Sequence, residues 1–360
     1  MDIKKTTLNS EVAKSNDLVP IMSKYDLQEL RLIAYCIAHY DSRKPDNRRF
    51  TAKVTDLAAI FDMAEDSAYS VIKKVVTAMS KPFTFKTDRD EELFIWWFQE
   101  FKYIPRNGEV EFMLNTGITP YLLELKERFS VYRLGDVHKF KAASTWHLFE
   151  NLNKWKNAGG WHVNLKKLHS ILGADGKYPR FDSFRQRIID PAIAEINEKS
   201  SLNVEYVKEK SGKTVIALRF FIDSKHPDYV ITVESQKNRL LKLLLGCGIR
   251  NHAAENIIEQ IVGAGREEHF IKKLPEMQKR WSAEKGSMPR YVAGAVKREL
   301  EQRSSKVEAK AKPEHAEALS CWLEKRSHKE VCKVRQRGGL PHRKKCRICL
   351  ARIPVADFGL

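Results

Sequence analysis

Two segments of the chain repeat one apolar pattern, and this repetition restricts the fold more than any other feature. Residues 50–61 read FTAKVTDLAAIF, and residues 161–172 read WHVNLKKLHSIL. The corresponding apolar pairs are Phe50 and Trp161, Val54 and Leu165, Leu57 and Leu168, Ile60 and Ile171, and Phe61 and Leu172. Their spacing is typical of a short segment that leads into an amphipathic helix. The sequence therefore predicts two related domains.

The residues around each copy predict the same order of elements. Amphipathic helices are expected before the copies, at 26–40 and 140–155, and after them, at 65–79 and 177–197. The helix expected at 65–79 has Asp66 or Ser67 as its expected N-cap. Each half then ends in two strands around a turn: LFIWWFQEFKYI and EVEFMLN around PRNG in the first half, NVEYV and TVIALRFFI around KSGK in the second. This is the order of a winged helix, found twice.

We therefore predict an α+β fold with two tandem winged-helix domains, a helical C-terminal region and a basic tail that contains cysteines. The expected ranges are 1–128 for the first winged helix, 129–228 for the second, 229–304 for the helical region and 305–360 for the tail.

The helix at 177–197 is the best candidate for reading DNA. At about 100° per residue, one face gathers apolar side chains; these are Phe181, Phe184, Ile188, Ala192 and Ile196. Ser183, Gln186, Arg187 and Asp190 point the other way, Asp182 lies on the flank, and Arg185 lies at the apolar border. Glu195 lies near the apolar face, where we expect it to bind a buried cation or a backbone group.

A helix of this kind fits the major groove, where arginine and glutamine can contact base edges, and lysines at a hairpin tip suit phosphates. The predicted DNA-binding residues are Arg180, Asp182, Ser183, Arg185, Gln186, Arg187, Asp190, Lys208, Lys210 and Lys213. The competing interpretation is a solvated helix with a polar turn. The order of elements and the charge favour DNA binding.

Charge and composition limit the class of protein. The formal net charge of +18 favours a polyanionic partner, here double-stranded DNA. The N-terminal residues lack the apolar core of a secretory signal, no apolar run is long enough to span a membrane, and six scattered cysteines indicate a reducing cytoplasm.

The sequence contains no recognisable set of catalytic residues. The segment SGKT at 211–214 has Val207 where a phosphate-binding loop needs glycine, and it joins two strands. No His-x-His pair is present for the metal of a rolling-circle nuclease. We therefore expect a binding protein and not an enzyme.

The segments LVPIMSKYDLQELRLIAYCIA, ITPYLLELKERFSVYRLGDVHKFKAASTWHLFENL and KYPRFDSFRQRIIDPAIAEIN resemble the iteron-binding plasmid replication initiators, the Rep proteins. The resemblance covers roughly residues 15–225 and implies two winged helices. It implies that the first mediates dimerisation and assists DNA contact, and that the second reads the origin repeats called iterons. The matching contact positions are Arg185, Gln186 and Arg187; the family favours basic residues there, and Gln186 departs from that pattern.

The resemblance also implies the function: replication initiation through iteron binding, origin opening and recruitment of host helicase or initiator proteins, with autoregulation. The alternative is a winged-helix transcriptional regulator without a role in replication.

The tail combines basic residues with cysteines. Between residues 325 and 352 there are eleven lysines or arginines and one acid, Glu330. CRIC supplies one CxxC pair, Cys346 and Cys349, and a zinc ion would need two further ligands from Cys332, Cys321 or His342. Two interpretations stay open: one zinc ion held by these residues, or reduced thiols in a tail without a cofactor.

Overall fold

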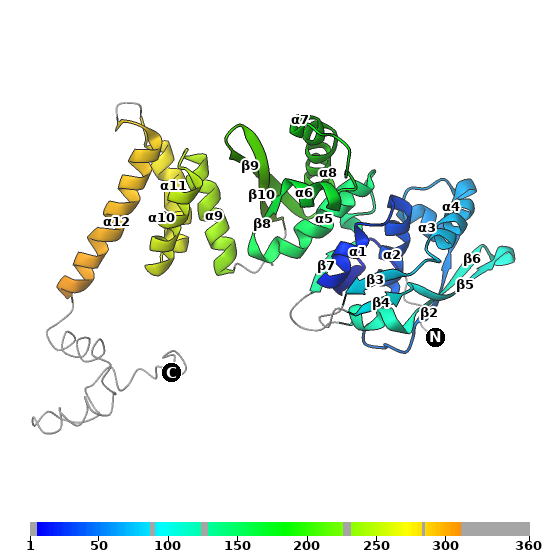
Figure 1. Ribbon diagram of the computed structural model, residues 1–360. Helices are drawn as coiled ribbons and strands as arrows, with labels where there is room; N and C mark the ends of the chain where they lie inside the picture. The colour runs from blue at the N-terminus through cyan, green and yellow to red at the C-terminus, as the bar shows by residue number, and fades with distance from the viewer. Residues whose placement is uncertain (1–5, 87–90, 124–128, 226–231, 283–284, 311–360) are drawn as a thin grey trace, which may run out of the picture.

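The computed structural model describes residues 6–86, 91–123, 129–225, 232–282 and 285–310. Three bodies follow one another in a row: a first winged helix, a second winged helix and a unit of four helices (Figure 1). In these ranges no helix combines the length and the apolar character needed to cross a membrane.

The first winged helix has three helices and a three-stranded antiparallel sheet. Its helices are α2 (Leu27–His39), α3 (Val54–Ile60) and α4 (Glu65–Ala78). Its strands are β2 (Arg49–Lys53), β5 (Phe98–Ile104) and β6 (Glu109–Leu114), in the order β2-β6-β5. A capping box between Asp26 and Glu29 starts α2.

The second winged helix repeats this plan. Its helices are α5 (Ala143–Trp155), α6 (Leu165–Ile171) and a third that runs through α7 (Phe181–Phe184), a π-helical turn (Arg185–Ile189) and α8 (Asp190–Lys199). Its strands are β8 (Gly160–Asn164), β9 (Leu202–Ser211) and β10 (Thr214–Ser224), in the order β8-β10-β9. Element for element this order matches the first sheet, so the predicted repeat of two winged helices is confirmed.

Two details of the first domain differ from the prediction. The segment LFIWWFQEFKYI is not one strand, because it bends at Trp96 and Trp97 into β4 (Glu92–Ile95) and β5. The buried Trp97 donates to the Tyr25 hydroxyl (2.9 Å), and β4 pairs with β3 (Phe83–Lys86) in a separate sheet.

The predicted N-cap of α4 is also wrong. The helix begins at Glu65, and the residue at its N-cap position is Ala64. The Ser67 hydroxyl donates to the carbonyl of Ala64 (3.0 Å) and therefore does not cap the helix.

The C-terminal unit is made of four helices. They are α9 (Val233–Gly246), α10 (Asn251–Gly263), α11 (Glu267–Lys279) and α12 (Met288–Lys310). Leu240, Leu244, Phe270 and Val292 belong to its core, which also takes in Phe221 from β10. The helical region expected from the sequence is therefore present.

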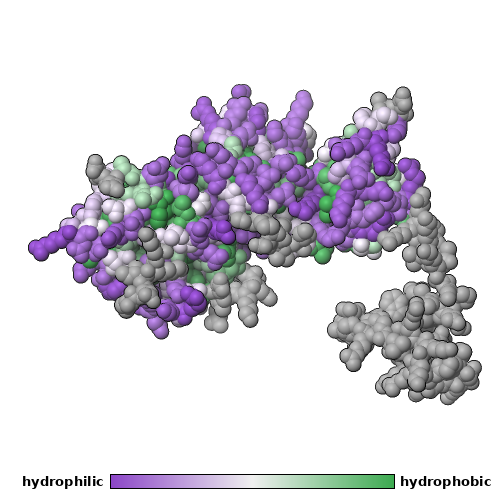
Figure 2. Space-filling view, turned by 180° about the vertical axis from the view of Figure 1, so that it is seen from behind, coloured by the Kyte–Doolittle hydropathy of each residue, from purple (hydrophilic) through white to green (hydrophobic). Residues whose placement is uncertain are grey.

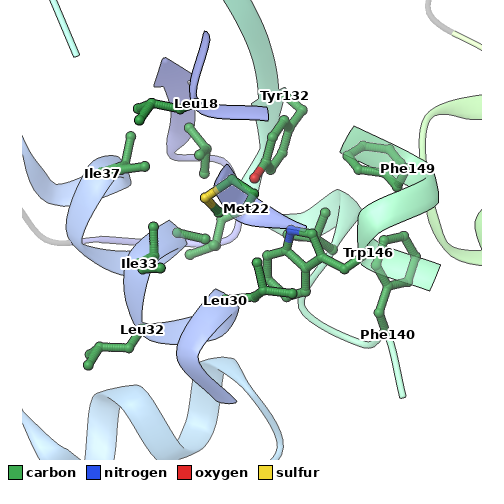
Figure 3. Close-up of a cluster of buried hydrophobic side chains, with 14 of the residues drawn as sticks. Leu18, Met22, Leu30, Leu32, Ile33, Ile37, Tyr132, Phe140, Trp146 and Phe149 are labelled. Carbon is green, nitrogen blue, oxygen red and sulfur yellow. The ribbon is translucent and has the colours of Figure 1, made fainter. Parts of the chain in front are cut away.

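The two winged helices share one core. β1 (Glu11–Ser15) pairs with β7 (Phe129–Arg133), which immediately precedes the second domain's helices. Figure 3 shows the apolar cluster at this junction: side chains of α1 (Val19–Met22) and α2 on one side meet Tyr132, Trp146 and Phe149 on the other.

A buried ion pair lies at this junction. Lys14 Nζ donates to Glu150 Oε2 (2.7 Å), and both side chains are completely removed from solvent. Glu150 Oε1 accepts from the Tyr132 hydroxyl (2.7 Å) and from Trp146 Nε1 (3.3 Å). Burial lowers the pKa of Lys14 below its ordinary value, and the Glu150 carboxylate opposes that shift. The pair joins β1 to α5, at opposite sides of the domain junction.

We predict that Lys14→Met destabilises the protein by about 3–5 kcal/mol, because the Glu150 carboxylate stays buried without its cation. Urea unfolding measures the loss. The double variant Lys14→Met/Glu150→Gln should regain part of it, since a neutral amide can still accept from Tyr132. Unchanged stability of the single variant would contradict this account of the pair.

Candidate nucleic-acid interface

The third helix of the second domain widens by one residue in its middle. The N–H of Asp190 donates to the carbonyl of Arg185, five residues back, which is the hydrogen bond of a π turn. Pro191 follows directly, and a proline within a helix lacks an N–H and crowds the carbonyl four residues before it. Widening the turn accommodates the proline while the helix continues to Lys199.

The π turn changes which side chains face the core. Beyond Phe184 the next fully buried residue is Ile189, five positions on, followed by Ala192, Ile193 and Ile196. Ile188, expected on the apolar face, is half-buried and packs against the same core. The apolar face therefore holds at Ile188, and Ile189 and Ile193 join it because the extra residue rotates the helix after Phe184.

The predicted contact residues of the helix divide into an exposed group and a pair, Arg185 and Asp190, that bind each other; the exposed Asp182 also forms an ion pair with Arg185 (3.7 Å). Arg180, Asp182, Gln186 and Arg187 are exposed, and Ser183 is half-buried. The guanidinium of Arg187 lies over the ring of Tyr178, 5.9 Å from its centroid, which supports the side chain from the preceding loop. Gln186 and Arg187 are thus side by side in sequence and open to solvent.

Arg185 and Asp190 bind each other within the protein. Arg185 Nη1 donates to Asp190 Oδ2 (2.8 Å), and Asp190 Oδ1 accepts from the Tyr206 hydroxyl of β9 (2.7 Å). Burial, together with the hydrogen bond to Asp190, raises the pKa of Tyr206 to about 12, so the phenol keeps the proton that it donates. This network ties the π turn to the wing.

Sequence reasoning missed the network and the π turn. Pro191 is the signal that could have revealed the turn, since a proline at this place in a long helix predicts a local distortion. Glu195, in contrast, has the role expected of it: its Oε1 accepts from Lys199 Nζ (2.7 Å) and from the backbone N–H of Lys141 (3.0 Å).

The wing is the long ribbon of β9 and β10. Ser211 pairs with Thr214, so Gly212 and Lys213 form its tip, and Gly212 has φ of 60°, a conformation that suits glycine. Lys208, Lys210 and Lys213 are exposed. Lys208 Nζ lies 5.2 Å from the ring centroid of Phe181, at the start of the third helix. Helix and wing therefore form one continuous surface with a basic excess.

The described residues contain no cluster of three or more potential metal ligands. The candidate zinc ligands Cys321, Cys332, His342, Cys346 and Cys349 lie outside the described residues.

Two family models match the chain. The model described as Initiator Replication protein, WH1, matches residues 11–153, and the model described as Initiator Rep protein, WH2, matches residues 164–222. Together they cover more than half of the chain. The first match takes in β7 and α5, which lie beyond the boundary expected at residue 128, and neither match reaches the helical unit.

Two Escherichia coli proteins and one solved structure are similar to the chain. An uncharacterized 27.6 kDa protein is 26% identical over 182 residues, which are 49% of this chain and 75% of that protein. The PI protein is 25% identical over 259 residues, which are 61% of this chain and 84% of that protein. The crystal structure of Pi initiator protein in complex with iteron DNA has a TM-score of 0.55 at 22% identity and covers 61% of this chain and 100% of that chain.

At that identity the structural likeness establishes the fold, and the family models establish the lineage of both domains. The first match contains the whole first winged helix and extends into α5, and the second contains the second winged helix from the end of β8 almost to the end of β10. The chain therefore belongs to the family of plasmid replication initiators built from two winged helices.

Proposed function

We propose that this initiator binds repeated duplex sites, the iterons, through its second winged helix. The observation that carries the proposal is the pairing of Gln186 and Arg187, both exposed on the third helix, with the wing lysines beside them. A major groove admits such a helix, and the wing then reaches the flanking phosphates. The related Pi initiator was solved in complex with iteron DNA, which supports this assignment.

The rest of the proposed activity follows from binding. Several chains on adjacent repeats would bend and open the neighbouring origin DNA, recruit host helicase or initiator proteins, and repress the chain's own gene. We propose that this takes place in the cytoplasm and without catalysis by the chain. A regulator that acts only at a promoter is not favoured, because both winged helices match initiator models.

Base reading and phosphate contact can be separated with two variants. Arg187→Ala should weaken binding to the specific site by about 1–3 kcal/mol if the guanidinium contacts a base edge. Lys210→Ala should weaken binding to specific and random duplexes by similar factors, since a phosphate contact has no sequence information. Fluorescence anisotropy with both duplexes gives the four affinities. Equal losses on specific and random DNA for Arg187→Ala would remove Arg187 as a base reader.

We propose further that the first winged helix forms a homodimer that binds iterons less well than the monomer. Leu93, Phe94 and Trp96 lie on or next to β4 and are 40%, 53% and 42% exposed. β4 belongs to a sheet of only two strands, so it also has an unpaired edge among the described residues. Exposed apolar side chains on such an edge favour association with a second copy.

Phe94→Asp should shift the chain toward monomer, because a carboxylate on the dimer surface would lose its hydration on association. Sedimentation velocity over a dilution series measures the shift, and iteron binding per chain should rise with it. Val233→Asp, which places the same charge at another exposed apolar residue (56% exposed) on α9, is the control. A chain that is monomeric at every concentration rules the dimer out.

For the tail we propose one zinc ion held by Cys332, Cys346 and Cys349 with Cys321 or His342. No cofactor is proposed for the winged helices. Native mass spectrometry should show a zinc-sized mass increment that Cys349→Ser abolishes. Metal-free protein with full DNA affinity would favour the alternative of unliganded thiols.

A further inference from the structure

We infer that the corner between α11 and α12 is a second DNA surface, which contacts phosphates beyond the duplex segment held by the second winged helix. The basic corner consists of Lys279, Arg280, Lys285 and Arg290, in the unit that neither family model reaches. The inference rests on the proposed DNA binding by the second domain and adds a contact surface to it.

The helical unit is docked tightly against the second winged helix. Thr232 Oγ1 donates to the carbonyl of Asn157 (2.7 Å), and Asn238 Nδ2 donates to the carbonyl of Ala158 (2.8 Å). A Cβ atom on Gly160 would meet Asn238 Oδ1 at 2.8 Å, a distance that real Cβ atoms do not tolerate. Glycine at this position therefore permits the close approach of α9.

Ion pairs and apolar packing hold the two bodies together as well. Lys242 on α9 binds Glu205 of β9 (2.8 Å), and Arg239 binds Asp223 of β10 (3.4 Å). Phe221 of β10 is buried in the core of the helical unit. Because the wing strands themselves carry these contacts, the helical unit has a fixed position relative to the wing.

The basic corner lies at the end of α11 and the start of α12. Lys279, Arg280, Lys285 and Arg290 are all exposed. Trp281 Nε1 donates to the carbonyl of Gly286 (2.9 Å), and Lys285 Nζ lies 5.4 Å from the ring centroid of Tyr291. These contacts hold the residues that precede 283 and those that follow 284 in place.

The charges of the corner are not neutralised by the described residues. Between residues 279 and 298 there are six lysines or arginines and one acid, Glu284. None of the four basic residues of the corner forms an ion pair with another residue that the structure describes. Farther along the same helices Glu299 binds Arg266, His269 and Lys273, so positive charge is compensated there and concentrated at the corner.

The basic corner faces the same way as the DNA-reading elements. In Figure 1 the start of α12, the tip of β9 and β10, and the start of α7 all reach the upper edge of the molecule. Figure 2, turned about the vertical axis, shows hydrophilic side chains along that upper edge. A duplex held by the recognition helix and wing can therefore continue past the helical unit, where uncompensated lysine and arginine suit its phosphates.

Duplex length tests this surface directly. A specific site is first selected by the full-length chain from a random-sequence duplex library. Affinity is then compared on a duplex that ends at the minimal site and on one extended at both ends by about 10 base pairs, one helical turn. The unchanged chain should bind the longer duplex more tightly. The corner variant Lys279→Ala/Arg280→Ala/Arg290→Ala should lose this gain, and its salt slope on the longer duplex should fall by about 2–3.

The matched control is Lys272→Ala/Lys297→Ala/Arg298→Ala. It removes three exposed charges from the same two helices, roughly 11 Å farther from the corner at 1.5 Å per residue. One of the three, Lys297, forms an exposed ion pair with Glu301 (3.9 Å). It should keep the gain in affinity with duplex length.

Equal gains for the corner variant and the unchanged chain would overturn the inference, as would equal losses for both variants. A selection that yields no preferred sequence would instead refute the proposed function, while binding to the minimal site by the corner variant shows that the variant is folded.

Discussion

One buried ion pair lies within the apolar core that joins the two winged helices. Lys14 enters from the first strand of the chain and Glu150 from the first helix of the second domain, and neither is accessible to water. Two charges in such a place lose their hydration, and only a close partner with further hydrogen bonds offsets that cost. Tyr132 and Trp146 supply those bonds to Glu150. A different angle between β1 and α5 would leave a charge buried without its partner, so the pair restricts the angle at which the domains meet.

The two winged helices have the same fold but differ in the third helix and in the strands that follow it. In both sheets the last strand of the domain lies in the centre, between the first strand and the second. In the first domain α4 is an uninterrupted helix, and the segment after it supplies an additional pair of strands with exposed aromatic residues. In the second domain Pro191 widens the helix, and Asp190 then lies within reach of both Arg185 and Tyr206. Asp190 thus links the third helix to the wing through Tyr206, whereas in the first domain the corresponding contact is between the rings of Tyr69 on α4 and Tyr103 on β5.

The sequence predicts the topology well because topology follows from apolar periodicity, which tolerates small local errors. The expected helices around residues 50–61 and 161–172 and the hairpins after them all exist. The errors occur where a side chain overrides that periodicity. Trp97 enters the core and bends a strand that reads as continuous, and the π turn before Pro191 buries Ile189 completely beside the half-buried Ile188. The Lys14–Glu150 pair was not predictable, because residues so far apart in the chain give no local signal, and lysine is rarely buried.

β10 connects the wing of the second domain to the helical unit. Its first residues follow the wing tip at Lys213, and its last residues, Phe221 and Asp223, pack against the helical unit. Any change in the angle of the wing relative to the domain would therefore also change the position of the helical unit, since one strand of the sheet carries both. Glycines at 159 and 160 let α9 lie against the turn that begins β8, the neighbouring strand, so the unit is held by two adjacent strands of the same sheet. The second winged helix and the helical unit are therefore joined through two strands of one sheet, whereas the first winged helix is joined to the second through their shared apolar core and the buried charges of β1 and α5.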